Sequence, residues 1–101
     1  MAMIERLFEA GDETIRLVVE APQPDGQDFR CAFTLQGAGF DRRDHAMGID
    51  QVQALVLALA KAHIDLLQAR RDGLAVTWLG GRDLGLPLPP HLTVADIETA
   101  D

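Results

Sequence analysis

The sequence predicts an α+β fold: an antiparallel meander of about four β-strands, one long helix packed across one face of it, and a final strand. Three observations lead to this prediction. Apolar and polar residues alternate in TIRLVVEA (residues 14–21) and FRCAFTLQ (residues 29–36), as in half-buried strands. From Gln51 to about Arg71 the chain has no glycine or proline and is rich in Ala and Leu, as in a helix. A strand-like segment, LAVTWL (residues 74–79), comes next.

The first half of the chain supplies the strands. MIERLFEA (residues 3–10) has a weaker alternation and leads into a short hairpin turn. Between the two clear strands, APQPDGQD (residues 21–28) carries two prolines and an Asp-Gly pair, which predict a turn.

A charged segment, FDRRDHAM (residues 40–47), follows a Gly-Ala-Gly turn and is expected to be a short edge strand, with a mobile loop as the alternative. On a strand, Asp41, Arg43 and His45 would share one face and Arg42 and Asp44 the other. Their charges could neutralise one another at the surface. Alternatively, Arg42 or Arg43 could bind a carboxylate of a partner.

The helix has clear start and stop signals. Asp50 is expected as its N-cap, with Gln53 at the third helical position as in a capping box. Arg70 and Arg71 would lie in the last turn, and Gly73 would end the helix.

The apolar residues of the helix predict two surfaces. One stripe is expected to face the sheet, and it contains Val52, Leu55, Val56, Leu59, Leu66 and Leu67. Leu57 and Ile64 lie off this stripe, so something else should cover them. The proline-rich segment or the tail could fold back over them, or they could form a homodimer or partner contact through the helix.

After the helix, Trp78 is expected either to anchor the edge of the core or to be an exposed contact residue. The segment GGRDLGLPLPP (residues 80–90) can be neither a helix nor a central strand. We expect a single domain over residues 1–90. Residues 91–101 would form a tail that makes one helical turn capped by Thr93 or is frayed.

Composition limits the classes of function that the sequence favours. The 101 residues suffice for one domain, and the net charge of −7, with no basic stripe, argues against nucleic acid and favours basic partners. One cysteine, no signal-peptide pattern and no apolar run long enough for a bilayer predict a cytoplasmic protein without a membrane span.

No motif for chemistry is present in the sequence. Cys31 is expected to be a buried thiol, and there is no serine for nucleophilic catalysis. His63 falls on the apolar stripe of the helix, where a structural role is expected, and no spacing typical of a metal site occurs. We therefore predict no catalytic, cofactor-binding or metal-binding residues.

Two segments carry a resemblance. GIDQVQAL (residues 48–55), and WLGG (residues 78–81) together with LGLP (residues 84–87), resemble the pattern of a family of small uncharacterised bacterial proteins. The resemblance covers most of residues 4–90 and implies strands, a helix and a Trp-bearing strand. That family brings no established activity, so no functional residue follows from it. Small bacterial immunity proteins are similar only in size and acidity.

The sequence thus favours a non-catalytic protein-interaction module. It would bind a basic partner, as an immunity protein does, or a second copy of itself. Its expected interaction surface comprises Leu57, Ile64, Arg42, Arg43 and Trp78. The alternative is a small-ligand-binding protein or minor enzyme. Its pocket would lie near the helix C-terminus and the segment GGRDLGLP, and would use His63, Arg70 and Arg82.

Overall fold

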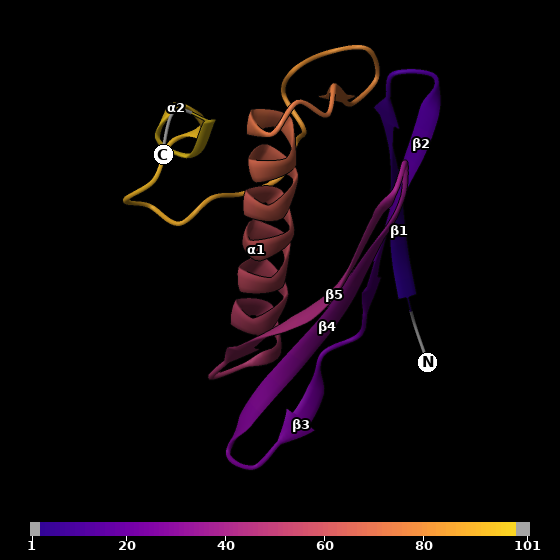
Figure 1. Cartoon of the computed structure of the whole chain (residues 1–101). Helices are drawn as coiled ribbons and strands as arrows, with labels where there is room; N and C mark the ends of the chain where they lie inside the picture. Colours follow the sequence, from indigo (N-terminus) through magenta and orange to yellow (C-terminus); the bar gives the residue numbers. More distant parts are fainter. Residues whose placement is uncertain (1–2, 99–101) are drawn as a thin grey trace.

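A computed structural model describes residues 3–98 of the chain, and within them the fold is α+β (Figure 1). The strands are β1 (Met3–Ala10), β2 (Glu13–Glu20), β3 (Gln23–Asp25), β4 (Asp28–Gly37), β5 (Phe40–Gly48) and β6 (Val76–Thr77). The long helix α1 (Gln51–Arg71) lies between β5 and β6 in sequence, and the short helix α2 (Val94–Glu98) follows β6. The predicted antiparallel sheet with one long helix against it is confirmed.

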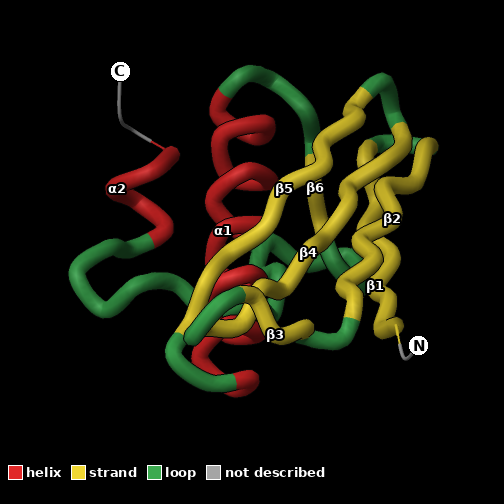
Figure 2. The backbone as a smooth tube through the Cα atoms, turned by 90° about the horizontal axis from the view of Figure 1, so that it is seen from below, coloured by secondary structure: helices red, strands yellow, loops and turns green. Residues whose placement is uncertain are grey.

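All pairings in the sheet are antiparallel, and the order β3-β4-β2-β1-β6 describes its main path. β5 pairs with β4 along almost its full length and forms one edge of the sheet. The views in Figures 1 and 2 agree that α1 lies between the sheet and α2. Because α1 packs mainly on β4 and β5, the other half of the sheet is farther from the helix.

Three details differ from the prediction or decide between its alternatives. The charged segment at residues 40–48 is a strand and not a loop. The expected turn at residues 21–28 contains the short strand β3, whose Pro24 sits opposite Phe29 on β4. Proline is tolerated there because β3 is an edge strand and its missing N–H leaves no partner unsatisfied. The last strand is shorter than LAVTWL suggested, since only Val76–Thr77 pair with β1.

The ends of α1 are as the sequence predicted. The Asp50 carboxylate accepts a hydrogen bond from the backbone N–H of Gln53 at 2.8 Å. The Gln53 side chain accepts one from the N–H of Ile49 at 2.7 Å, so this capping box reaches one residue further back than usual. Asp72 caps the C-terminus, and Gly73 takes the left-handed φ of 107° that ends a helix.

The face of α1 that packs on the sheet is not the predicted one. Val52 and Val56 are 70% and 44% exposed, whereas the small residues Ala54, Ala58 and Ala62 are fully buried. Alanines every fourth residue let the helix axis approach the sheet closely, so the packed face is turned by about a quarter of a turn from the stripe of largest side chains. The predicted stripe was therefore wrong at its N-terminal end, although Leu66 and Leu67 are buried as expected.

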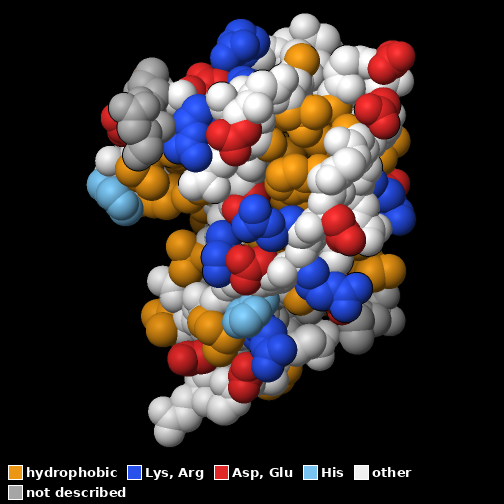
Figure 3. All heavy atoms as spheres, in the orientation of Figure 1, with side chains coloured by type: hydrophobic (Ala, Val, Ile, Leu, Met, Phe, Trp, Pro, Cys, Tyr) orange, Lys and Arg blue, Asp and Glu red, His pale blue; other side chains and the backbone are white. Residues whose placement is uncertain are grey.

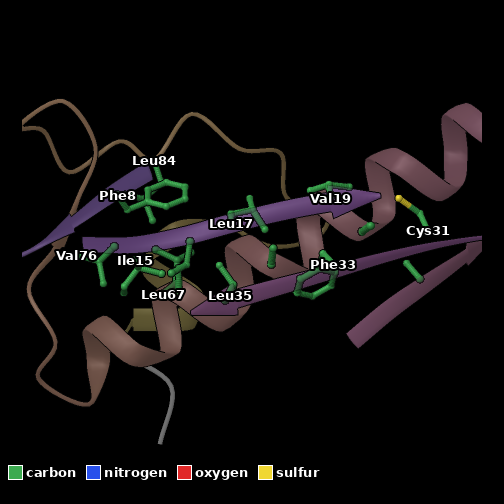
Figure 4. Packing of buried hydrophobic residues seen from close by; sticks show 14 of the residues in the cluster. Phe8, Ile15, Leu17, Val19, Cys31, Phe33, Leu35, Leu67, Val76 and Leu84 are labelled. Atoms are coloured by element: carbon green, nitrogen blue, oxygen red, sulfur yellow. The ribbon is translucent and has the colours of Figure 1, made fainter. Parts of the chain in front are cut away.

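The core lies between the sheet and α1 (Figure 4). Its largest fully buried side chains come from the alternating positions of the strands, from the second half of α1 and from the segment after β6; they are Phe8, Ile15, Leu17, Val19, Cys31, Phe33, Leu35, Leu66, Leu67, Val76 and Leu84. The period-two pattern therefore identified the inward face of β2 and β4 correctly.

The chain after β6 covers the back of the C-terminal half of α1. Ile97 of α2 is buried in the core, and Asp96 donates its backbone N–H to the Thr93 hydroxyl, the predicted cap. By length and hydropathy alone α1 could span a membrane, but half of its most apolar window is buried within the protein. Core helices of globular proteins have the same property, so this match carries little weight.

Candidate functional site

The outer edge of β5 and the groove beside it form the first candidate surface, which we call the edge surface. Register with β4 places Arg42 and Asp44 opposite the buried Leu35 and Phe33, on the face toward α1. The residues that alternate with them, Asp41, Arg43 and His45, point to the opposite, solvent-exposed face. The alternation expected from the sequence is therefore present.

Side chains cap the middle of this edge. The backbone N–H of His45 donates to the Asp44 carboxylate at 2.8 Å, and its carbonyl accepts from the Lys61 ammonium at 3.0 Å. Lys61 also pairs with Asp44 at 3.3 Å. The hydrogen bond from the His45 N–H, followed by that from Lys61, lowers the pKa of Asp44. Asp44 and Lys61 thus occupy the two outward backbone groups of His45.

Beneath the edge lies a buried carboxyl group. Asp65 of α1 is 8% exposed, and its Oδ1 is 3.4 Å from Nη1 of Arg42. Its Oδ2 has no hydrogen-bond partner among the residues that the structure describes. Burial raises the pKa of Asp65, and the nearby Arg42 guanidinium only partly opposes this. On the face seen in Figure 3, Lys and Arg side chains lie beside Asp and Glu across the middle, with apolar side chains around them.

The groove of the edge surface runs between β5, α1 and the proline-rich segment. It has a volume of about 400 Å³, and its lining includes Met47, Leu57, Ile64 and Pro89. Leu57 is 39% exposed, while Ile64 is partly buried against the core. The proline-rich segment thus reaches the two aliphatic residues that the sequence singled out, but does not cover Leu57 fully.

A second apolar surface lies at the other flank of α1. Two adjoining clefts of about 160 Å³ each share Ile4 of β1 and Val19 of β2, and we call them together the N-terminal groove. Leu55 and Leu59 of α1 line one cleft each. The groove is open because α1 packs on the β4–β5 half of the sheet and leaves β1 uncovered at this end.

Apolar residues of α1 border the N-terminal groove. The exposed Val52 and Val56 lie one turn of α1 from Leu55 and Leu59, so they extend the apolar lining along the helix. Glu5 and Glu20 also line one cleft each, but they alternate with Ile4 and Val19 along β1 and β2, so their side chains point to the opposite face of the sheet, where Glu5 pairs with Arg16. Arg6 also lines the first cleft, but its guanidinium is engaged by two backbone carbonyls of the segment after β6.

The three residues expected for a ligand pocket are all engaged within the chain. Nδ1 of the buried His63 is 3.1 Å from the carbonyl oxygen of Pro87, and burial lowers the pKa of this histidine. Arg70 donates to the Glu98 carboxylate at 3.0 Å and to the Val76 carbonyl at 2.8 Å. Arg82 reaches the same carboxylate at 2.9 Å. Arg70 and Arg82 therefore meet on α2, whereas His63 attaches the proline-rich segment to α1.

Trp78 lies at the opposite edge of the sheet from β5. The guanidinium of Arg6 stacks 3.8 Å from the centre of its indole ring, and Gly85 packs so closely that a Cβ there would come 2.4 Å from the ring. The turn that follows Trp78 is held by Glu9, which accepts a hydrogen bond from the N–H of Gly80 at 2.8 Å. Of the five expected interaction residues, the structure brings Leu57 and Ile64 together in one groove and places Arg42 on the same face of the sheet, paired with Asp65. Arg43 points to the opposite face, and Trp78 lies at the opposite edge.

Other groups with potential chemistry are isolated. Cys31 is fully buried and 3.3 Å from the carbonyl oxygen of Glu20, and burial raises its pKa. Within residues 3–98, no three His, Cys, Asp or Glu side chains come close enough together to hold a metal ion.

Comparison with known proteins adds one finding. The family described as "Domain of unknown function (DUF6968)" matches residues 4–88, most of the chain. The chain belongs to the DUF6968 family. The two segments that resemble a family pattern in the sequence, residues 48–55 and 78–87, both lie within this match. No curated protein and no solved structure matches the chain.

Membership of the DUF6968 family assigns no activity to either of these surfaces. Sequence reasoning missed Ile4, Lys61 and Asp65. The signal for Lys61 and Asp65 was available, since two charged residues four apart in an otherwise apolar helix imply polar partners on the facing element. Ile4 had no such signal, because its exposure follows from where the helix lies on the sheet.

Proposed function

We propose that this member of the DUF6968 family is a cytoplasmic, non-catalytic protein-interaction module that binds a basic partner through the N-terminal groove. The observation that carries the proposal is the uncovered apolar flank of α1. Val52 and Val56 are exposed beside the half-buried Leu55 and Leu59, and no element among residues 3–98 covers them. Contiguous apolar surface of this kind is typical of sites that bind other proteins.

The size of the groove and the charge of the protein favour a basic protein segment as the ligand. Each cleft has about the volume that holds one benzene-sized group, so the pair suits two apolar side chains of a partner better than a cofactor. The net charge of −7 complements a basic partner and would speed its association at low salt.

Retention of a partner on immobilised protein tests the proposal. Replacing Val52 and Val56 together by Ser should abolish retention of a basic protein from an extract of the source cell, because both side chains would be buried in the complex. The matched control is Leu79→Ser, since Leu79 is 81% exposed and lies on the turn after β6. The control should retain the partner, and raised salt should release it from both the control and the unaltered protein.

Two results would count against this function. One is that no basic protein is retained at low ionic strength. The other is that the Val52/Val56 variant retains it as well as the Leu79→Ser control does. Equal circular dichroism spectra for the two variants would show that the loss is not one of folding.

The alternative, a small-ligand-binding protein or minor enzyme, would need His63, Arg70 and Arg82 to face one pocket. In the structure Arg70 and Arg82 bind the same Glu98 carboxylate, whereas His63 contacts the Pro87 carbonyl, so all three are engaged within the chain, an arrangement that favours the interaction module. A screen of metabolites by thermal shift separates the two functions, because a ligand specific to the folded protein must raise its melting temperature.

A further inference from the structure

We propose that β5 pairs with β5 of a second copy of this chain, so that two sheets join into one continuous antiparallel sheet around a two-fold axis at Arg43. This contact is separate from the N-terminal groove, which lies at the opposite flank of α1. The proposal rests on the open edge of β5, on the order of its charges and on the groove beside it.

The backbone of β5 is available for pairing. Both backbone groups of His45 bind side chains outside the sheet, so they point away from β4. Since an antiparallel strand directs alternate residues to opposite edges, the backbone groups of Asp41, Arg43 and Met47 point outward as well. In the part of the chain that the structure describes, β5 pairs only with β4.

The charges of β5 are complementary to themselves when the strand is turned around Arg43. Arg42, which contacts Asp65 in the single chain, then faces Asp44 of the second copy, and Asp41 faces the imidazole of His45 of the second copy, each pair occurring twice. Opposite charges directly across two strands stabilise their pairing, and like charges oppose it. Arg43 faces Arg43 of the second copy. This pair lies on the exposed side of the sheet, where the two long side chains can point away from each other into water.

Neighbouring registers are less favourable. Moving the axis by one residue toward the C-terminus places Asp44 against Asp44 of the second copy. Moving it one residue toward the N-terminus places Arg42 against Arg42. The register centred on Arg42 also pairs Asp41 with Arg43 twice, so it differs from the one centred on Arg43 in the place of its like-charged pair. In both neighbouring registers that pair lies on the α1 face, which is less accessible to water, whereas Arg43 against Arg43 lies on the exposed face, and this difference favours the register centred on Arg43.

The groove of the edge surface fits the same register. Phe40 of the second copy would lie opposite Ala46, on the α1 face, where Ala46, Leu57 and Ile64 line the groove. The half-exposed Leu57 would then be covered by an aromatic side chain. An apolar contact would therefore flank each end of the charged centre of the interface.

Formation of the dimer requires a local exchange. In the single chain Lys61 and Asp44 occupy the two backbone groups of His45, which would instead pair with Asp41 of the second copy. The Lys61 side chain is 46% exposed, so it can leave without disturbing the core. Because side-chain hydrogen bonds are given up for backbone ones, we expect a reversible dimer whose population rises with protein concentration.

Cysteine cross-linking tests both the dimer and its register. In the proposed pairing, Arg43 lies about 5.5 Å from Arg43 of the second copy between Cα atoms, which is within the range of a disulfide. Arg43→Cys should therefore form a reducible dimer under mild oxidation, directly or through a short thiol-reactive linker. The matched control is Met47→Cys on the same exposed face, because it would lie roughly 27 Å from its copy.

Charge reversal provides an independent test by analytical ultracentrifugation. Asp41→Lys with His45→Lys places like charges opposite each other and should abolish the dimer. Asp41→Lys with His45→Asp places opposite charges there and should keep the dimer. Both side chains are exposed, so these variants should fold alike. The proposal is overturned if the unaltered protein stays monomeric at all concentrations, if Met47→Cys cross-links as fast as Arg43→Cys, or if the two charge variants associate equally.

Discussion

Replacing the buried Asp65 by Asn should make the protein more stable at neutral pH. One carboxylate oxygen is buried without a hydrogen-bond partner among the described residues, and the other is at the long distance of 3.4 Å from Arg42. An unsatisfied buried polar atom costs about 1–3 kcal/mol, and more when it is charged. The pair with Arg42 offsets at most about 1 kcal/mol of this, because the guanidinium is 47% exposed to water.

Asn keeps the shape of the side chain and removes its charge, so about 1 kcal/mol should be gained in the free energy of unfolding. For a domain of this size that gain corresponds to an increase of about 4–8 °C in melting temperature. The measurement is thermal unfolding followed by circular dichroism at pH 7 and at several lower pH values.

The pH dependence provides a sharper test than the gain itself. Burial raises the pKa of Asp65 above its ordinary value of 3.8, so the folded protein binds this proton more tightly than the unfolded chain. The loss of stability caused by the charged Asp65 carboxylate is therefore absent below pH 3.8 and grows as the pH rises through the raised pKa. The advantage of Asp65→Asn should accordingly shrink on acidification.

Asp44→Asn is the matched control, because hydrogen bonds to its carboxylate lower the pKa of Asp44 and the substitution should destabilise the protein at neutral pH. The reasoning is refuted if Asp65→Asn is no more stable than the unaltered protein at pH 7. A gain that stays constant down to pH 3 would refute it as well.

Three further predictions concern the fold. Gly48→Ala should destabilise the protein by about 1–3 kcal/mol in urea unfolding, because its Cβ would come 2.3 Å from the backbone nitrogen of Ala54. Val56→Ala should lower the free energy of unfolding by less than about 0.5 kcal/mol, whereas Leu66→Ala should lower it by about 2–5 kcal/mol. Equal losses would mean that Val56 is buried, as the stripe expected from the sequence requires. Burial lowers the pKa of His63 below its ordinary value of 6.5, so stability should fall as the pH drops through 6.5, and a His63→Gln variant should lose less.

The strands, the helix and its ends could be read from the sequence because they depend on neighbouring residues. Alternation along β2 and β4 determined which side chains are buried, and Asp50 and Gly73 marked where α1 begins and ends. The alternating charges on β5 likewise followed from its period of two. Family membership was suggested by two short segments of the chain and agrees with the match over residues 4–88.

The side of α1 that faces the sheet was decided only by the tertiary structure. Periodicity tells which residues of a helix share a face, but not which face meets the sheet when several flanks are apolar. Here the alanines allow the closest approach of α1 to the sheet, so the face that carries them packs against it. The C-terminal segment covers the back of the helix as far as His63. The N-terminal groove, the partnership of Arg42 with Asp65 and the exposure of Val52 all follow from that orientation, because each depends on contacts between residues distant in the sequence.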